Sequence, residues 1–227
     1  MAASLNLYGD SLVMTTGKHG ADISSQRMDD LDVETILYAL QLKDRKGTSL
    51  DLKCGIGIQG LRLASLGFRT LLIDWIPVNM TVLRVVGLNE LLPLSYLMKD
   101  ARALESADLP TEIAVCYSQR FIHYLTFDEA VALLGLVRQQ MLPGAKLFLS
   151  VSGLLSELGD IYQGKSHELS RRFAPLPESM AEKHNIHEPV CLYTPDDLVS
   201  LCQKASFSCD RVYSSAFGNV RGVFTTA

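Results

Sequence analysis

Short apolar runs alternate with amphipathic segments over most of this chain. The apolar runs predict strands at 49–53, 69–74, 95–99, 112–117 and 145–151, and the periodic segments predict helices at 31–42, 58–66, 127–141 and 195–205. Two further strand-like runs flank Gly218 and Asn219, a pair typical of a hairpin turn. Such alternation indicates an α/β fold whose mostly parallel sheet carries helices on both faces.

Several boundary signals support these elements. In the helix at 31–42, four apolar side chains fall on one face, the pattern of an amphipathic helix: Val33, Ile36, Leu37 and Leu40. Thr126 and Glu129 have capping-box spacing, and Thr194 precedes a helix that starts with Pro195. We also expect Pro77 to open a helix, and Pro143 with Gly144 to form the turn into the strand at 145–151.

The length and the alternation predict one domain. A chain of 227 residues that is 48% hydrophobic can bury one sizeable core. We expect residues 1–227 to form a single domain, with an N-terminal cap segment and helix at 1–45. The alternation is interrupted at 153–190, a segment too long for a passive connection, which we interpret as a lid inserted after the fifth strand.

Charge and composition exclude some classes of protein. A net charge of -4 and a pI near 5.7 argue against bulk nucleic-acid binding. The five cysteines have no CxxC spacing, the first residues lack the pattern of a signal peptide, and no apolar run reaches the roughly 20 residues that span a bilayer. These features predict a cytoplasmic protein without a membrane segment.

Residues 49–60 contain the main chemical motif. A predicted buried strand runs into a turn with Gly55 and Gly57, where the backbone can approach a ligand and a helix amino terminus presents free N–H groups. Asp74 ends the next strand and can accept hydrogen bonds from both hydroxyls of a ribose. Because Gly60 completes a GxGxxG pattern, an NAD-dependent oxidoreductase competes with other nucleotide-cofactor enzymes on this motif alone.

Asp51 and the terminal hairpin favour a different cofactor. Dehydrogenase fingerprints prefer an apolar residue at the position of Asp51, whereas a cofactor with a free amino group needs a carboxylate there. The sequence resembles the class I S-adenosylmethionine-dependent methyltransferases, whose first motif usually reads acidic-x-Gly-x-Gly-x-Gly. The resemblance is good over 49–151 and loose over 193–227, and it rests on these segments: Asp51-Leu-Lys53-Cys54-Gly55-Ile-Gly57, Asp74-Trp75, Asp100-Ala101, CYSQRFIHYL, PGAKLFLSVSG and TPDDL.

The resemblance implies a Rossmann-like sheet of seven strands in the order 3-2-1-4-5-7-6, with the last strand antiparallel. It also implies S-adenosyl-L-methionine as the cofactor. The residues that it assigns to the cofactor are Asp51, Lys53, Cys54, Gly55, Gly57, Asp74, Trp75, Asp100, Ala101 and Tyr117.

Lys53 departs from the family pattern, because it stands where the family has its first glycine. At about 4 Å and an effective dielectric near 20, its ammonium would repel the cofactor's sulfonium by roughly 4 kcal/mol. Lys53 can avoid this by pairing with an acid such as Asp100 or Glu34, or it can bind the cofactor's own carboxylate. A third outcome is a catalytically silent binding or regulatory protein in which Lys53 occupies the pocket.

Methyl transfer depends mainly on alignment and exclusion of water, so a dedicated base is optional. Cys116-Tyr117-Ser118-Gln119-Arg120 lacks the Asn/Asp-Pro-Pro-Tyr/Phe signature of amide or base nitrogen methylation, which favours an oxygen or sulfur acceptor on a small molecule. The candidate catalytic residues are His123, Tyr117 and Tyr124. The candidate substrate-binding residues are Tyr8, Lys18, Gln119, Arg120, Arg171 and Arg172. His184 and His187 lack a third ligand at helical spacing, so we expect no metal site.

Overall fold

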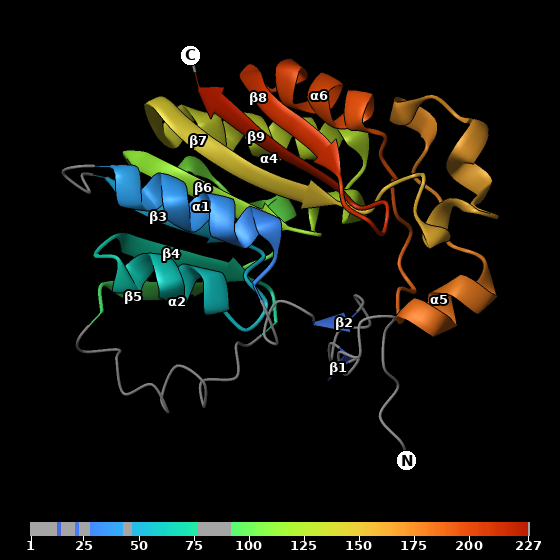
Figure 1. The fold of residues 1–227 in the computed structure, drawn as a ribbon, viewed down its shortest axis with the longest axis horizontal. Coiled ribbons are helices and arrows are strands. Elements are labelled where there is room, and N and C mark those ends of the chain that lie inside the picture. The colour runs from blue at the N-terminus through green and yellow to red at the C-terminus, as the bar shows by residue number, and fades with distance from the viewer. Residues whose placement is uncertain (1–12, 15–20, 23–27, 43–46, 77–91, 227) are drawn as a thin grey trace.

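The computed structural model describes residues 13–14, 21–22, 28–42, 47–76 and 92–226. Its main sheet has seven strands in the order β5-β4-β3-β6-β7-β9-β8 (Figure 1). The bounds are β3 (Thr48–Leu52), β4 (Arg69–Asp74), β5 (Leu94–Met98), β6 (Ile113–Gln119), β7 (Met141–Val151), β8 (Phe207–Ser214) and β9 (Val220–Thr226). Strands β3 to β7 pair in parallel, and β9 lies antiparallel to both of its neighbours. Counted from β3, this is the predicted order 3-2-1-4-5-7-6. A separate pair is formed by β1 (Val13–Met14) and β2 (Ala21–Asp22).

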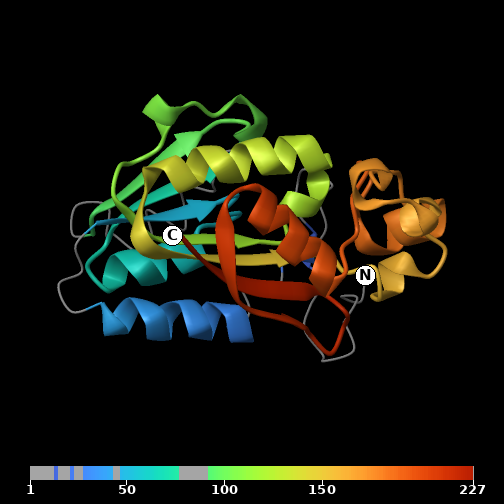
Figure 2. The same cartoon turned by 90° about the horizontal axis from the view of Figure 1, so that it is seen from above.

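Helices cover both faces of the sheet, as the alternation predicted (Figure 2). Helices α1 (Asp30–Gln41) and α2 (Ile58–Ser65) lie on one face, and α4 (Phe127–Gln140) and α6 (Pro195–Lys204) on the other. The expected capping boxes are present at Thr126 and Thr194. Within the described residues, no helix combines the length and apolar character needed to cross a membrane.

Strand β6 separates two parts of the core, because its successive side chains point to opposite faces. Cys116 packs in the cluster that contains residues of α4 and α6, whereas Val115 and Tyr117 pack with Leu31 of α1. The carboxyl end of β6 therefore places residues from both layers beside the ends of β3 and β4.

Helix α1 is rotated relative to the sequence expectation. Of the four predicted apolar residues Ile36 packs against the core, whereas Val33, Leu37 and Leu40 are 42%, 54% and 51% exposed, so most of the predicted apolar face is not the buried one. Its buried residues include Asp32 and Thr35. Both polar side chains have partners: Asp32 accepts from the Tyr117 hydroxyl, and the Thr35 hydroxyl donates to the Leu31 carbonyl (2.7 Å). Because these groups are hydrogen-bonded, their burial is tolerated.

Two local expectations have other outcomes. Strand β7 begins at Met141, so Pro143 and Gly144 lie inside the strand rather than in a turn before it. Gly144 has a φ of 73°, which marks a local irregularity near the start of the strand. The helix expected from Pro77 lies outside the described residues.

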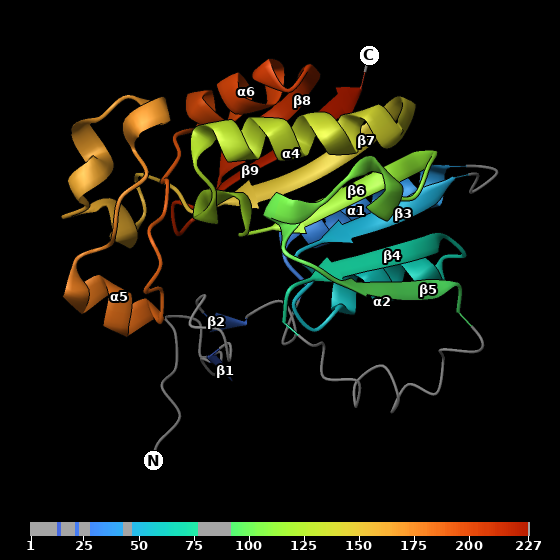
Figure 3. The ribbon, with the colours of Figure 1, turned by 180° about the vertical axis from the view of Figure 1, so that it is seen from behind.

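The inserted segment forms a compact lobe next to the carboxyl end of β7 (Figures 1 and 3). It contains α5 (Glu178–His184) and the short helices η4 (Glu157–Gly159), η5 (Gln163–Ser166) and η6 (Leu169–Arg171). The lobe has its own apolar cluster, which includes Leu158, Leu176 and Val190. Bridges between Gly153 and Tyr193 and between Ala174 and Val190 close it at its base.

Two glycine substitutions are expected to have opposite effects on stability. A Cβ at Gly153 would lie 1.7 Å from the carbonyl oxygen of Gly218, a backbone atom that cannot move without shifting the hairpin between β8 and β9. We expect Gly153→Ala to lower the free energy of unfolding by about 2 kcal/mol. Gly135→Ala is the matched control, because Gly135 lies within α4 and a Cβ there meets no atom within 4 Å. It should raise the free energy by about 0.5 to 1 kcal/mol. Urea unfolding of the two variants measures both changes. Equal effects would contradict the close approach of Gly153 to the Gly218 carbonyl.

Candidate functional site

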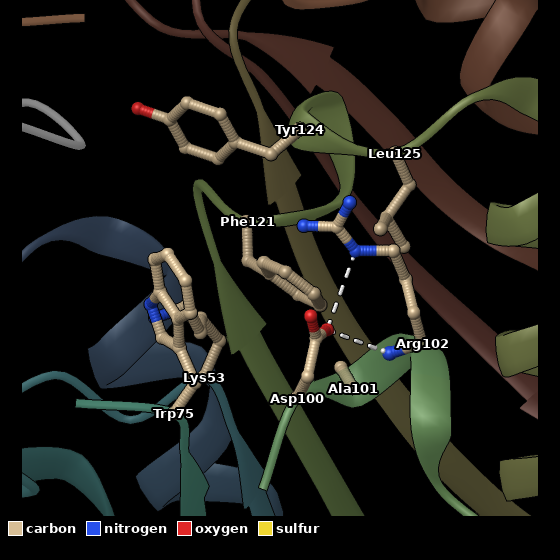
Figure 4. Close-up of a pocket in the computed structure, with 8 residues that line it drawn as sticks. All are labelled: Lys53, Trp75, Asp100, Ala101, Arg102, Phe121, Tyr124 and Leu125. Atoms are coloured by element: carbon tan, nitrogen blue, oxygen red, sulfur yellow. Dashed lines mark hydrogen bonds and ion pairs between the residues drawn. The ribbon is translucent and has the colours of Figure 1, made fainter. Parts of the chain in front are cut away.

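A cavity lies at the carboxyl ends of the parallel strands, where ligands bind in open α/β sheets. Its empty volume is about 340 Å³, including space open to solvent. The lining residues come from the ends of β3, β4, β5 and β6 and from the segments that follow them: Lys53, Trp75, Asp100, Ala101, Arg102, Phe121, Tyr124 and Leu125. Figure 4 shows Lys53 and Trp75 on one side of this cavity and Asp100 and Arg102 on the other.

The glycine turn between β3 and α2 forms one edge of the site. Lys53, Gly55 and Gly57 all have positive φ, at 64°, 57° and 80°. This region of φ is open to glycine at no cost and disfavours a lysine by roughly 1 kcal/mol or more. The backbone of the turn therefore follows the path that the glycine-rich motif predicts, and it imposes that path on Lys53.

Asp51 is buried behind this turn rather than in the cavity. It is 2% exposed, and its Oδ2 accepts the Gly60 N–H at 2.7 Å. Burial raises the pKa of its carboxyl to about 7, and the hydrogen bond from Gly60 opposes that rise. In this structure Asp51 therefore holds the start of α2 against β3.

Lys53 and Asp74 form an ion pair at the ends of β3 and β4. The Lys53 side chain is 18% exposed and that of Asp74 is 3% exposed. Asp74 also accepts the N–H groups of Gly55 (2.9 Å) and Ile76 (3.1 Å). Burial lowers the pKa of the Lys53 ammonium, and the charge of Asp74 opposes that shift. Lys53 thus pairs with neither Asp100 nor Glu34, the partners that the sequence suggested.

The cavity has a polar side chain at Asp100 and aromatic side chains at Trp75 and Phe121. Asp100 accepts the backbone N–H of Arg102 at 3.0 Å and its Nε–H at 3.3 Å, which caps η1 (Ala101–Ala103). Trp75 follows Asp74 directly, and its ring lies 5.1 Å from Lys53 Nζ. Phe121 follows β6 and is 5% exposed. These side chains offer aromatic rings and one carboxylate acceptor to a bound group.

The polar residues at the end of β6 are held by α1 and by the end of β7. Tyr117 donates its hydroxyl to Asp32, and Gln119 Nε2 donates to Asp29 Oδ2 at 2.6 Å. Arg120 has a φ of 50°, and its backbone N–H donates to the Ser150 carbonyl at 2.8 Å. These three residues do not line the cavity.

His123 and Tyr124 lie in η3 (Ile122–Tyr124), which follows β6. Tyr124 lines the cavity, whereas His123 is 1% exposed. The Ser152 N–H donates to His123 Nδ1 (3.3 Å), and the Cys191 N–H donates to its carbonyl (2.7 Å). His123 therefore connects the sheet to the end of the inserted lobe, and burial raises the pKa of Tyr124 well above its usual range.

The remaining candidates are spread over the molecule. Arg171 is exposed, and Arg172 is buried in an ion pair with Asp197 at the start of α6. Cys54 is half-buried in the glycine turn, where burial raises the pKa of its thiol well above the usual value. Tyr8 and Lys18 lie outside the described residues.

Sequence reasoning missed three residues of the cavity: Arg102, Phe121 and Leu125. Arg102 directly follows the Asp100-Ala101 pair. Phe121 and Leu125 flank the His123-Tyr124 pair within the segment that carried the resemblance. A count of every residue in the first turn after each parallel strand would have found them, because those turns meet at one edge of the sheet.

Comparison with known proteins gives fold neighbours and no sequence relatives. No family model matches the chain, and no curated protein matches it. A methyltransferase from Clostridium acetobutylicum that depends on S-adenosylmethionine has a TM-score of 0.63 at 8% identity, over 90% of this chain and 95% of that one. The 1,6-didemethyltoxoflavin-N1-methyltransferase of Burkholderia thailandensis, solved with S-adenosylhomocysteine, has a TM-score of 0.62 at 11% identity, over 91% and 81%.

Larger proteins match over part of their length. The mitomycin 7-O-methyltransferase has a TM-score of 0.59 at 15% identity, over 86% of this chain. The chain spans 54% of that protein, and also 54% of the pyocyanin biosynthetic protein that it resembles. The order of the strands, the antiparallel β9 and these neighbours lead to one conclusion: the chain has the fold of the class I S-adenosylmethionine-dependent methyltransferases.

Proposed function

We propose that this chain is an enzyme that binds S-adenosyl-L-methionine and transfers its methyl group to a small molecule. The observation that carries the proposal is the cavity at the strand ends, where Trp75, Asp100 and Phe121 surround a space of about 340 Å³. In this assignment Trp75 and Phe121 contact the adenine, Asp100 accepts its amino group, and Asp74 binds the ribose. The antiparallel β9 distinguishes the sheet from the wholly parallel dinucleotide-binding order and argues against the NAD-dependent alternative.

The acceptor is proposed to be an oxygen or sulfur atom. The segment that follows β6 carries no Asn/Asp-Pro-Pro-Tyr/Phe signature, and Tyr124 is the candidate catalytic residue that lines the cavity. The Tyr124 hydroxyl is protonated at neutral pH and can donate a hydrogen bond to an acceptor oxygen, and burial raises its pKa further.

Nucleoside binding tests the cofactor assignment. Titration calorimetry should detect adenosine and S-adenosylhomocysteine. Inosine should bind at least about tenfold more weakly, because it has no amino group to donate to the Asp100 carboxylate. Asp100→Asn should reduce this preference, whereas Asp196→Asn, a change at an exposed residue in the first turn of α6, should leave it unchanged. Binding of NADH without adenosine would contradict the proposal.

A second function is favoured by the Lys53–Asp74 ion pair. Because Lys53 occupies acceptor positions of Asp74, the site could serve as a nucleoside-binding or regulatory module without methyl transfer. Release of S-adenosylhomocysteine from S-adenosylmethionine in the presence of small phenols and thiols separates the two functions. Nucleoside binding with no release in any mixture would support the second.

A further inference from the structure

We propose that Lys53 is a specificity-determining residue that makes this site favour an uncharged adenosyl thioether over the adenosyl sulfonium. The inference rests on the proposed function, because it assumes that the cavity binds an adenosyl group. It goes beyond that function by naming the charge state of the sulfur that the site prefers. S-adenosylhomocysteine is the thioether, and S-adenosylmethionine is the sulfonium.

The Lys53 side chain lies in the cavity. Its Cα belongs to the glycine turn, and its side chain lies along the cavity, with Nζ bonded to Asp74 and 5.1 Å from the centre of the Trp75 ring. The side chain is 18% exposed, so its ammonium lies within the site rather than in open solvent. The turn fixes the backbone of Lys53 at a φ of 64°, and the ion pair with Asp74 fixes the direction of its side chain.

The carboxylates around the cavity are paired with cations. A cationic ligand is favoured where carboxylates outnumber the cations that pair with them. Here Asp74 is paired with Lys53, and Asp100 is paired with Arg102. Asp51 faces Gly60 behind the turn, and its raised pKa leaves it partly neutral near pH 7. Among the residues that the structure describes here, the carboxylates therefore give little net attraction for a sulfonium.

The repulsion between Lys53 and a bound sulfonium can be estimated from their separation. The sulfur of an adenosyl group is attached to the ribose, so for a ribose at Asp74 we take a separation of about 7 Å between the sulfur and Lys53 Nζ for the estimate. At that distance and an effective dielectric near 20, the Lys53 ammonium alone repels a sulfonium by about 2.4 kcal/mol, which is roughly 50-fold in affinity relative to a site in which the charge of Asp74 is unpaired. Salt reduces this to about tenfold at physiological ionic strength. The thioether has no charge on sulfur and escapes this repulsion.

The test is a comparison of dissociation constants in wild type, Lys53→Met and Lys53→Arg. Calorimetry gives the constants for S-adenosylmethionine, S-adenosylhomocysteine and adenosine with each protein. Lys53→Met keeps most of the length of the side chain and removes the charge, so the ratio of the dissociation constant for the sulfonium to that for the thioether should fall about tenfold or more. Lys53→Arg keeps the charge and should keep the wild-type ratio. A shift of the ribose after loss of the bond to Asp74 acts on both ligands and cancels in the ratio, whereas the unpaired charge of Asp74 acts on the sulfonium.

The outcomes separate this inference from the proposed function. A ratio that falls in Lys53→Met and stays in Lys53→Arg supports the inference. Binding of adenosine and S-adenosylhomocysteine with the same ratio in all three proteins overturns the inference and leaves the proposed function intact. Absence of binding by adenosine and S-adenosylhomocysteine in every protein overturns both. Lys53→Gly, which also removes the positive-φ cost, repeats the measurement if the methionine variant does not fold.

Discussion

Replacing Asp51 with asparagine is expected to stabilise this protein above pH 7 by about 2 kcal/mol. Burial raises the pKa of the Asp51 carboxyl to about 7 in the folded protein, against 3.8 for an unperturbed aspartate. A folded pKa above the unfolded value means that the folded state binds the extra proton between these limits. The stability that the protonated Asp51 carboxyl contributes is therefore fully present below about pH 4, and it is lost as the pH rises through 7.

The magnitude follows from this shift. At high pH the Asp51 carboxylate is ionised although burial raises its pKa from 3.8 to about 7. This lowers the free energy of unfolding by roughly 4 kcal/mol. Asparagine carries no charge, and its oxygen can still accept the Gly60 N–H. Its amide N–H groups are new buried donors, however, which offsets part of the gain and leaves about 2 kcal/mol.

Urea unfolding from pH 4 to pH 9 measures this prediction. The wild type should lose stability relative to Asp51→Asn as the pH rises from 5 to 8, and the difference between the proteins should change little above pH 8. Asp160→Asn is the matched control, because Asp160 is exposed and its change should stay within about 0.5 kcal/mol at every pH. A stability difference between wild type and Asp51→Asn that does not depend on pH would contradict the buried, pH-sensitive carboxyl.

The sheet and the glycine turn could be predicted because their signals are local. The strand bounds depend on short apolar runs, and the capping boxes at Thr126 and Thr194 depend on residues three positions apart. The order of the strands came from the resemblance, since periodicity does not specify which strands pair. Residue patterns indicated the hairpin of β8 and β9, but not that β9 pairs antiparallel with β7.

Helix α1 shows what periodicity cannot decide. Its sequence offers one stripe with Val33, Leu37 and Leu40 and another with Leu31, Thr35 and Ala39, and a count of apolar residues selects the first. The structure buries the second. Thr35 bonds within the helix, and Asp32 is held by the Tyr117 hydroxyl on β6, a partner 85 positions away in the chain. Only the tertiary contact makes the polar stripe the buried one.

The partner of Lys53 could have been predicted by one further step. Strands β3 and β4 pair in parallel with Leu52 opposite Ile73, so the next residues, Lys53 and Asp74, face each other where the strands end. The sequence motif assigned Asp74 to the ribose, so Asp100 and Glu34 were the expected partners of Lys53. Adjacent parallel strands that end in a lysine and an aspartate favour an ion pair, because both side chains leave the sheet at the same edge.

Replacing Arg172 with methionine is expected to destabilise the inserted lobe by about 3 kcal/mol. The Arg172 side chain is 9% exposed and links three parts of the fold: its Nη1 donates to the Leu192 carbonyl (3.0 Å) and to Asp197, and its Nε donates to the His167 carbonyl (3.2 Å). Asp197 is also the third residue of α6, where it completes the capping box with Thr194. Methionine fills similar space but leaves a half-buried carboxylate without its cationic partner and two carbonyls without the guanidinium donor, and removal of one partner from a buried pair costs about 3 to 5 kcal/mol.

Arg171→Met is the matched control, because Arg171 is the preceding residue, is exposed and was an equal candidate for substrate binding on sequence grounds. Its effect on unfolding should stay within about 0.5 kcal/mol. Arg172→Lys should fall between the two, since lysine keeps the charge but cannot reach all three acceptors with one ammonium. Thermal unfolding and limited trypsin digestion measure the series, with cleavage in residues 153–193 faster only when Arg172 is changed. Equal stability in Arg171→Met and Arg172→Met would show that this anchor does not hold the lobe.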